Sequence, residues 1–208
     1  NGKFFTLEAS QLPGGRGHGE PVRLMVDLEE NHELVELFVH EPGRKLVVAA
    51  TSGHGFIVAE DEVVASTRNG RQVLNVDGDA EARVCVPVPP GADTLATVGE
   101  NRRMLVFALD EVNEMTRGKG VILQRFAEGS LADAKAFVAK EGLSWVDAAG
   151  RTYTLDEMET VYDQYAGRDG LCDAVLVELD SARGEHAAKR VAYSAAVRLE
   201  KPAGGDQH

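Results

Sequence analysis

Basic residues beside glycine recur four times along the chain, and this combination can bind phosphate. The four turns carry Arg16, Arg71, Lys119 and Arg168. Glycine lets a backbone approach a phosphate closely, and the N–H groups of such a turn can point at its oxygens. A lysine or arginine adds positive charge, and arginine can bind phosphate through two parallel hydrogen bonds. These turns are therefore candidates for contacts with a polyanion.

The spacing of the turns is regular. Their basic members lie 55, 48 and 49 residues apart. A second landmark, a polar turn followed by a short β-prone run, begins at residues 1, 52, 101 and 149, which gives steps of 51, 49 and 48 residues. Two independent landmarks that keep one period indicate an internal repeat of about fifty residues.

Several short segments with β-strand character must position these turns. One follows each polar turn, as at residues 56–58 and 104–107, and in the later repeats another precedes it, as at residues 46–50. A further strand is predicted after each glycine turn, at residues 22–28, 73–76, 121–124 and 171–179. Short β-branched runs around Gly and Asn turns are typical of hairpins. Repeats of this length and content predict the blades of a propeller-like structure.

The predicted fold is an all-β, propeller-like β-pinwheel of four to five blades, formed as a single domain by residues 1–200. The first blade is predicted to be incomplete at the N-terminus, and residues 201–208 to be a disordered tail. The repeats are expected near residues 1–45, 46–92, 93–140 and 141–180.

Two segments allow more than one structure. Residues 130–140 have a serine N-cap candidate and helix formers, but they are also compatible with a blade strand. Residues 181–189 are compatible with helix or loop, and the alternation at residues 191–199 predicts a final strand.

Composition counts in part against nucleic acid. The net charge is −12 and the isoelectric point is about 4.9, whereas phosphate binding depends on Lys and Arg. Many acids, however, cluster in short runs, and several basic residues lie beside glycine. The sequence is therefore still compatible with a positive rim on an acidic body. Cys85 and Cys172 form no CxxC pair, which fits a reducing cytoplasm. No signal peptide is recognisable, and the abrupt start suggests a fragment of a longer chain.

Three segments resemble a known family. Residues 14–24 (GGRGHGEPVRL) and 67–73 (TRNGRQV) are similar to the first blades of the C-terminal domain of the bacterial topoisomerase IV A protein. Residues 117–121 (RGKGV) resemble part of the glycine-basic box of the gyrase A C-terminal domain. No turn matches the full gyrase box, Gln-Arg-Arg-Gly-Gly-Lys-Gly, which favours topoisomerase IV. The resemblance covers residues 1–166.

The resemblance implies a β-pinwheel whose basic outer rim binds and bends duplex DNA. In the family, the domain is attached to a cleavage core that carries the DNA-attacking tyrosine and binds magnesium with its partner subunit. The resemblance therefore implies no catalytic residue and no cofactor in this chain, with ATP and Mg used by other domains. The implied partners are double-stranded DNA, the cleavage core of the same polypeptide and the topoisomerase IV B protein. The isolated domain is expected to be a monomer, in the cytoplasm and associated with the nucleoid.

The candidate DNA-binding residues are the basic residues of the glycine turns and of the hairpin turns. Such side chains would contact phosphates, so little base specificity is expected. Those of the glycine turns rank first: Arg16, Arg68, Arg71, Arg117, Lys119 and Arg168. Those of the hairpin turns rank second: Arg102, Arg103 and Arg151.

Other sites find little support in the sequence. Residues 75–79 resemble the start of a calcium loop, but the twelfth position is Val86 instead of Glu, so a polar turn is expected. The six histidines show no metal-ligand spacing, and no metal site is predicted. The main rival function is a protein-interaction module whose acidic pinwheel surface docks a basic chromosome-associated or regulatory partner. A free-standing enzyme or ligand binder is disfavoured because no catalytic constellation is recognisable.

Overall fold

The computed structural model of the chain describes residues 1–15, 17–101, 103–146, 152–155, 174–179 and 188–192. Within these ranges the only helices are three-residue 3-10 helices, which confirms the prediction of an all-β chain. The helices are η1 (Ala9–Gln11), η2 (Val22–Leu24), η3 (Glu60–Glu62), η4 (Leu109–Glu111) and η5 (Ala139–Glu141). The strands are β1 (Lys3–Phe4), β2 (Lys45–Ala50), β3 (His54–Ala59), β4 (Arg71–Gln72), β5 (Ala82–Val88), β6 (Thr94–Gly99), β7 (Arg103–Ala108), β8 (Val121–Ile122), β9 (Leu131–Phe137), β10 (Leu143–Val146), β11 (Thr152–Leu155), β12 (Ala174–Leu179) and β13 (Ala188–Ala192).

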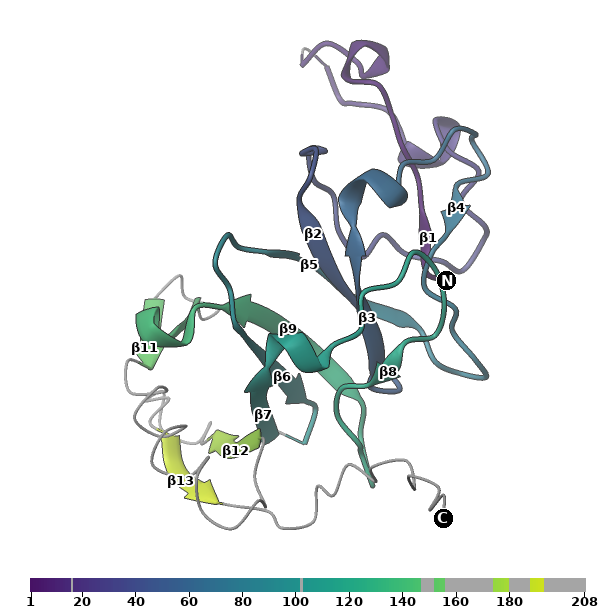
Figure 1. The fold of residues 1–208 in the computed structure, drawn as a ribbon. Helices are drawn as coiled ribbons and strands as arrows, with labels where there is room; N and C mark the ends of the chain where they lie inside the picture. Colours follow the sequence, from purple (N-terminus) through teal and green to yellow (C-terminus); the bar gives the residue numbers. More distant parts are fainter. Residues whose placement is uncertain (16, 102, 147–151, 156–173, 180–187, 193–208) are drawn as a thin grey trace, which may run out of the picture.

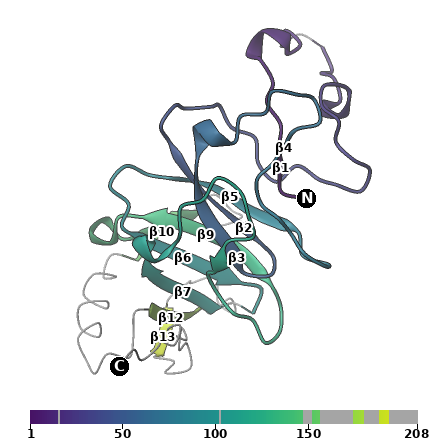
Figure 2. The ribbon, with the colours of Figure 1, turned by 45° about the vertical axis from the view of Figure 1, so that its right-hand side comes forward.

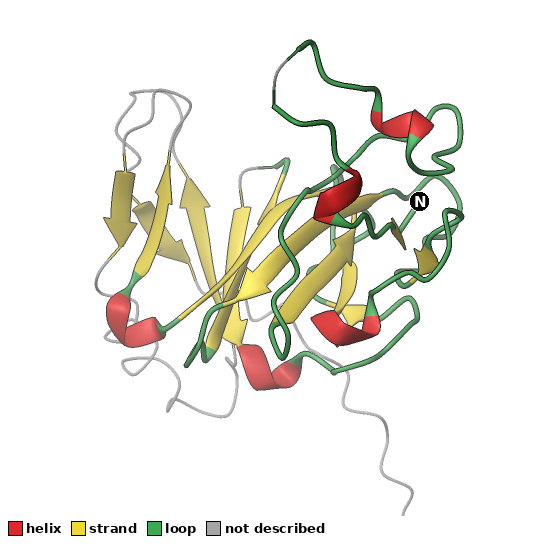
Figure 3. Cartoon of the chain, turned by 90° about the horizontal axis from the view of Figure 1, so that it is seen from above, coloured by secondary structure: helices red, strands yellow, loops and turns green. Residues whose placement is uncertain are grey.

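The strands form two larger antiparallel sheets and two strand pairs. The sheets have the orders β5-β2-β3-β8 and β13-β12-β7-β6-β9, and the pairs are β1-β4 and β10-β11. The sheet of β2 and β3 lies between the β1-β4 pair and the sheet of β6 and β7 (Figures 1 and 2). Seen from above, the sheets follow one another across the molecule, with the N-terminal loops at one end (Figure 3). The succession of similar small sheets is the propeller-like arrangement that the repeat predicts.

The second, third and fourth repeats each contribute strands to two sheets. β2, β3 and β5 come from one repeat, whereas β8, which follows the glycine turn of the next repeat, pairs with the start of β3. β4 pairs with β1 in the same way, and β12 pairs with β7. The strand after a glycine turn thus extends the sheet of the preceding repeat and joins successive repeats together. β12 lies within the strand predicted at residues 171–179, and β13 pairs with it.

β2 shows why an uninterrupted apolar run is a strand in this fold. Successive side chains of a strand point to opposite faces of the sheet. Val47 and Ala49 pack in one core cluster with residues of the next repeat, including Leu95 and Phe107. Leu46, Val48 and Ala50 pack in a second cluster on the opposite face, with Phe4, Val73 and Leu74. Both faces of the sheet are buried, so both sets of side chains are apolar.

The prediction of a strand at residues 22–28 is wrong. This segment forms η2 and turns, and no strand among the described residues lies beside it. A strand needs a neighbour for its N–H and C=O groups, and β4 and β8 have such neighbours in β1 and β3. Residues 131–137 form β9, so the strand alternative holds for that segment, and η5 follows it. The final strand spans residues 188–192, while residues 180–187 and 193–208, with the predicted tail, lie outside the described ranges.

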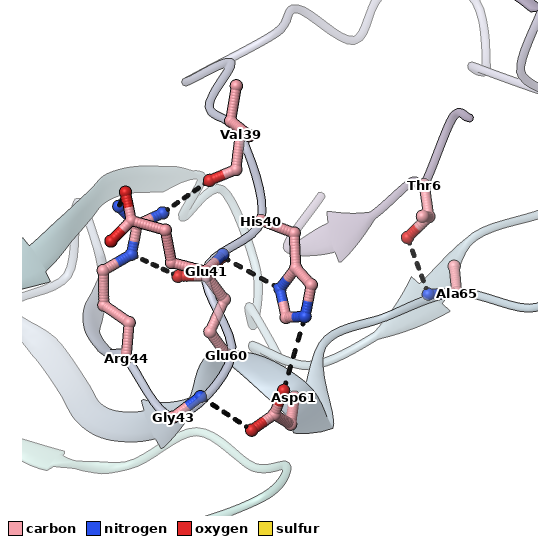
Figure 4. A network of polar contacts seen from close by, with 9 residues as sticks. All are labelled: Thr6, Val39, His40, Glu41, Gly43, Arg44, Glu60, Asp61 and Ala65. Carbon is pink, nitrogen blue, oxygen red and sulfur yellow. Dashed lines mark hydrogen bonds and ion pairs between the residues drawn. The ribbon is translucent and has the colours of Figure 1, made fainter. Parts of the chain in front are cut away.

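A buried carboxylate fastens the connector between the first two repeats (Figure 4). The side chain of Glu60, at the start of η3, has no solvent exposure. It accepts hydrogen bonds from Arg44 Nε and from the backbone N–H of Glu41 at 2.7 Å, and its Oε1 lies 3.0 Å from His40 Nδ1. Burial alone would raise the pKa of the Glu60 carboxyl, but these bonds together hold that pKa below its usual value.

Neighbouring polar groups extend this cluster. Asp61 Oδ1 lies 3.3 Å from His40 Nε2, and Asp61 Oδ2 accepts the N–H of Gly43 at 2.9 Å. Arg44 also pairs with Glu41 at 3.0 Å and donates to the carbonyl of Val39 at 2.9 Å. The cluster thus holds residues 39–44, which lead into β2, against η3, which ends β3.

Candidate nucleic-acid interface

Gly70 and Gly120, fifty residues apart, occupy equivalent positions at the ends of two basic turns. Their φ angles are +74° and +84°. A Cβ on Gly70 would lie 2.7 Å from the carbonyl oxygen of Phe4, and a Cβ on Gly120 would lie 2.1 Å from that of Gly55. Only glycine combines such a φ with such a close backbone contact. The glycine requirement at these positions therefore arises from packing against the preceding repeat, and not from the approach of a phosphate.

The backbone N–H groups of these turns are also used within the fold. Gly118 donates to the carbonyl of Val73 at 2.9 Å, and its own carbonyl accepts the N–H of Asn75 at 2.7 Å. Gly70 donates to the carbonyl of Thr67 at 3.1 Å. The expectation that such N–H groups point outward at phosphate is wrong for Gly70 and Gly118. Because these two N–H groups are used within the fold, the basic side chains are the leading candidates in these turns for contacts with a polyanion.

The two described basic turns lie close together. Leu74 follows Arg71 by three residues, about 10 Å along an extended chain, and Leu74 forms a parallel bridge with Gly118. The turn at residues 67–71 and the turn at residues 117–120 are thus neighbours, although they belong to different repeats. A duplex carries one negative charge per about 1.7 Å of its axis, so a 10 Å stretch offers roughly six phosphates.

In the turn of the second repeat, Arg68 and Arg71 both reach solvent. Arg68 donates to the carbonyl of Leu24 at 2.7 Å, and its Nε lies 3.7 Å from the carboxylate of Asp27. Arg71 forms an ion pair of 3.1 Å with Glu62 at the end of η3. Both guanidinium groups are therefore exposed but already paired with a carboxylate.

In the turn of the third repeat, Arg117 and Lys119 are exposed. Lys119 Nζ lies 3.0 Å from Asp77, which belongs to the second repeat. Within the described residues, the side chain of Arg117 has no hydrogen-bond or ion-pair partner. Burial, and secondarily the charge of Lys119, lower the pKa of the nearby His54, so this imidazole is neutral at pH 7.

The remaining candidate residues are placed only in part. Arg103 begins β7 and is exposed, and its backbone N–H donates to the side chain of Asn101 at 3.1 Å. The other four lie outside the described residues: Arg16, Arg102, Arg151 and Arg168. The structure thus brings together two of the four glycine turns.

Sequence reasoning missed the carboxylates that pair with the cations of these turns. Asp27 and Asp77, fifty residues apart, lie 41 and 42 residues before their partners Arg68 and Lys119. Glu62, on η3, lies nine residues before its partner Arg71. The polar turn expected at residues 75–79 is present, and Asp77 within it holds Lys119. The repeat period relates Asp27 to Asp77, so it was a signal for the two pairs that join neighbouring repeats, whereas Glu62 pairs with Arg71 within one repeat.

A metal site and a membrane-spanning helix were also sought in the part of the chain that the structure describes. No group of three or more His, Cys, Asp or Glu side chains is placed to hold a metal ion there. No helix in the same ranges has the length and apolar character needed to cross a bilayer.

Comparison with known families gives the assignment. The family model described as "DNA gyrase C-terminal domain, beta-propeller" matches residues 1–41, 44–84 and 93–133, one stretch in each of the first three repeats. These stretches together make up more than half of the chain. The chain belongs to the gyrase A and topoisomerase IV A C-terminal domain family. The propeller-like fold predicted from the repeat is thereby confirmed.

Individual relatives support the topoisomerase IV side of this family. The chain is 44% identical over 151 residues to the DNA topoisomerase 4 A protein of Caulobacter vibrioides, covering 73% of this chain and 20% of that protein. It is 42% identical over 144 residues to the Rickettsia bellii protein of the same name, covering 69% and 19%. The chain thus spans about a fifth of the length of these relatives.

A solved structure shows the same fold. The chain matches the structure of the E. coli ParC C-terminal domain with a TM-score of 0.66 and 19% sequence identity. The match covers 85% of this chain and 78% of that one. The resemblance to the topoisomerase IV A C-terminal domain, inferred from the glycine turns, is confirmed.

Proposed function

We propose that this gyrase A and topoisomerase IV A family member is a non-catalytic domain that binds and bends duplex DNA. In this proposal it presents DNA segments to a type IIA topoisomerase and tunes the preference of ATP-dependent strand passage among supercoiled and linked substrates. The observation that carries the proposal is the neighbouring placement of two basic turns from different repeats, with Arg117 exposed in one of them.

The geometry supports contacts to the DNA backbone more than to bases. Arg68, Arg71, Arg117 and Lys119 are exposed and lie at strand-joining turns, where each repeat meets the one before it. We refer to these four side chains as the rim cations. A further turn of the same kind is expected in the fourth repeat, around Arg168. Cations repeated from blade to blade would form a curved row, which is the arrangement that bending a stiff duplex requires.

The rest of the enzyme is part of the same proposal. The chain would act beside a cleavage core of its own polypeptide and the topoisomerase IV B protein, which would supply the tyrosine, ATP and magnesium. Its own contribution would need no cofactor. The place of action would be the nucleoid in the cytoplasm, and the isolated domain would be a monomer.

A charge reversal in the third-repeat turn tests the DNA contact. We expect Arg117→Glu/Lys119→Glu to weaken binding to a short duplex about tenfold or more at low salt, because two phosphate-facing cations become anions. The slope of log affinity against log salt concentration should fall by about 2. Fluorescence anisotropy with a labelled duplex measures both quantities.

The matched control is Arg83→Glu/Lys140→Glu, which changes the net charge equally. Arg83 lies on β5 and Lys140 follows β9, and these two edge strands are on the far side of their sheets from β8 and β12. Both residues are exposed. Equal binding by the two double variants would show that net charge alone determines the affinity for DNA, and it would contradict the rim proposal. If the wild-type chain binds no DNA but captures a basic protein after DNase treatment, the rival interaction function replaces it.

A further inference from the structure

Three of the four rim cations are held by carboxylates of the same chain. Arg71 pairs with Glu62 at 3.1 Å and Lys119 with Asp77 at 3.0 Å, while the contact of Arg68 with Asp27 is longer, at 3.7 Å. The three carboxylates are about half exposed or more, at 47%, 67% and 52%. Within the described residues, the rim is thus a row of ion pairs with one uncompensated arginine, Arg117.

We infer that Glu62 and Asp77 compete with DNA phosphates for Arg71 and Lys119, and so set the salt range in which the rim holds DNA. This inference rests on the proposed DNA-binding function. Before a phosphate can bind either cation, the carboxylate must be displaced, and it then remains beside the incoming polyanion and repels it. The pairs are at the surface, where a single ion pair is weak. The competition therefore lowers the affinity for DNA without preventing binding.

The arrangement makes the competition local to the rim. Glu62 comes from η3 of the same repeat as Arg71, whereas Asp77 comes from the repeat before Lys119. The distance between Asp77 and Lys119 therefore depends on how the two repeats pack. Because DNA bending would pull on successive repeats, this pair would couple phosphate binding to the contact between repeats.

Neutralising the two acids with little change of shape tests the inference. We expect Glu62→Gln/Asp77→Asn to bind a short duplex about threefold to tenfold more tightly than the wild-type chain at low salt. The slope of log affinity against log salt concentration should steepen by up to about 0.9 for each carboxylate removed. Thermal unfolding of each protein checks that the variants are folded.

The control is Glu81→Gln/Glu141→Gln, which removes the same charge from exposed acids before β5 and in η5. It should bind within about twofold of the wild-type chain, since these exposed acids pair with none of the rim cations. If both double variants bind equally tightly, or neither exceeds a wild-type chain that does bind DNA, the competition is overturned and the DNA-binding proposal stands. If the wild-type chain and all variants fail to bind at the lowest salt, the DNA-binding proposal falls as well.

Discussion

Replacing Gly120 by alanine is expected to remove about 3 kcal/mol of the free energy of unfolding, from the left-handed backbone and from the steric clash together. The new Cβ would lie 2.1 Å from the carbonyl oxygen of Gly55, a backbone atom that can move only if β3 moves. β8 follows directly, and its pairing with β3 joins the third repeat to the second. Urea denaturation followed by circular dichroism measures the loss.

Gly91→Ala separates the two contributions. Gly91 has nearly the same φ, +77° against +84°, but a Cβ there meets no heavy atom within 4 Å. Its replacement should cost about 1 kcal/mol, from the left-handed backbone alone. Equal losses in the two variants would mean that the contact between repeats contributes nothing to the glycine requirement, contrary to the close packing at Gly120.

Replacing Glu60 by glutamine is expected to lower the free energy of unfolding at pH 7 by about 2–3 kcal/mol, because a buried, bonded charge is lost while its partners stay in place. The backbone N–H of Glu41 and the side chains of Arg44 and His40 would all face a neutral amide. The next repeat places Leu109 at the corresponding start of η4, so the fold itself does not need an acid at this position. The charge of Glu60 instead holds the connector at residues 39–44 in place.

The loss should depend on pH in a defined direction. The folded-state pKa of Glu60 lies below its usual value, so the stabilisation is fully present above the unfolded pKa, about 4.3, and declines as pH falls through the folded pKa. The wild-type chain and Glu60→Gln should therefore converge in stability toward acid pH. Glu62→Gln, in the same helix but about half exposed, should change stability little at any pH. A constant difference between wild type and Glu60→Gln from neutral to acid pH would contradict the role of the carboxylate charge.

The sequence predicts the architecture well because the period repeats a whole structural unit. The apolar run at residues 46–50 and its counterpart at residues 94–98 become β2 and β6, since β2 packs into a core cluster on each face and β6 is buried along most of its length. Residues 22–28 have similar β character, but they find no strand neighbour among the described residues. Local pattern sets the capacity to form a strand, and the neighbouring repeat decides whether one forms.

The candidate site could be predicted only in part. The exposure of Arg68, Arg71, Arg117 and Lys119 follows from their position in polar glycine turns. The role of Gly120 does not, because the carbonyl of Gly55 that excludes a side chain is 65 residues away. Asp27 and Asp77 likewise pair with cations of the following repeat, whereas Glu62 pairs with Arg71 within its own repeat. Contacts between repeats are long-range, so a turn's own sequence carries no record of them.

The most direct measurement of the central claim is the affinity of the wild-type chain for a labelled duplex of about 40 base pairs as salt rises from about 20 to 200 mM. If the four rim cations contact phosphates, binding is tight at low salt and the slope of log affinity against log salt concentration lies between about −2 and −4. A protein that binds no duplex at the lowest salt, or that binds with no dependence on salt, would contradict the claim that this rim holds DNA.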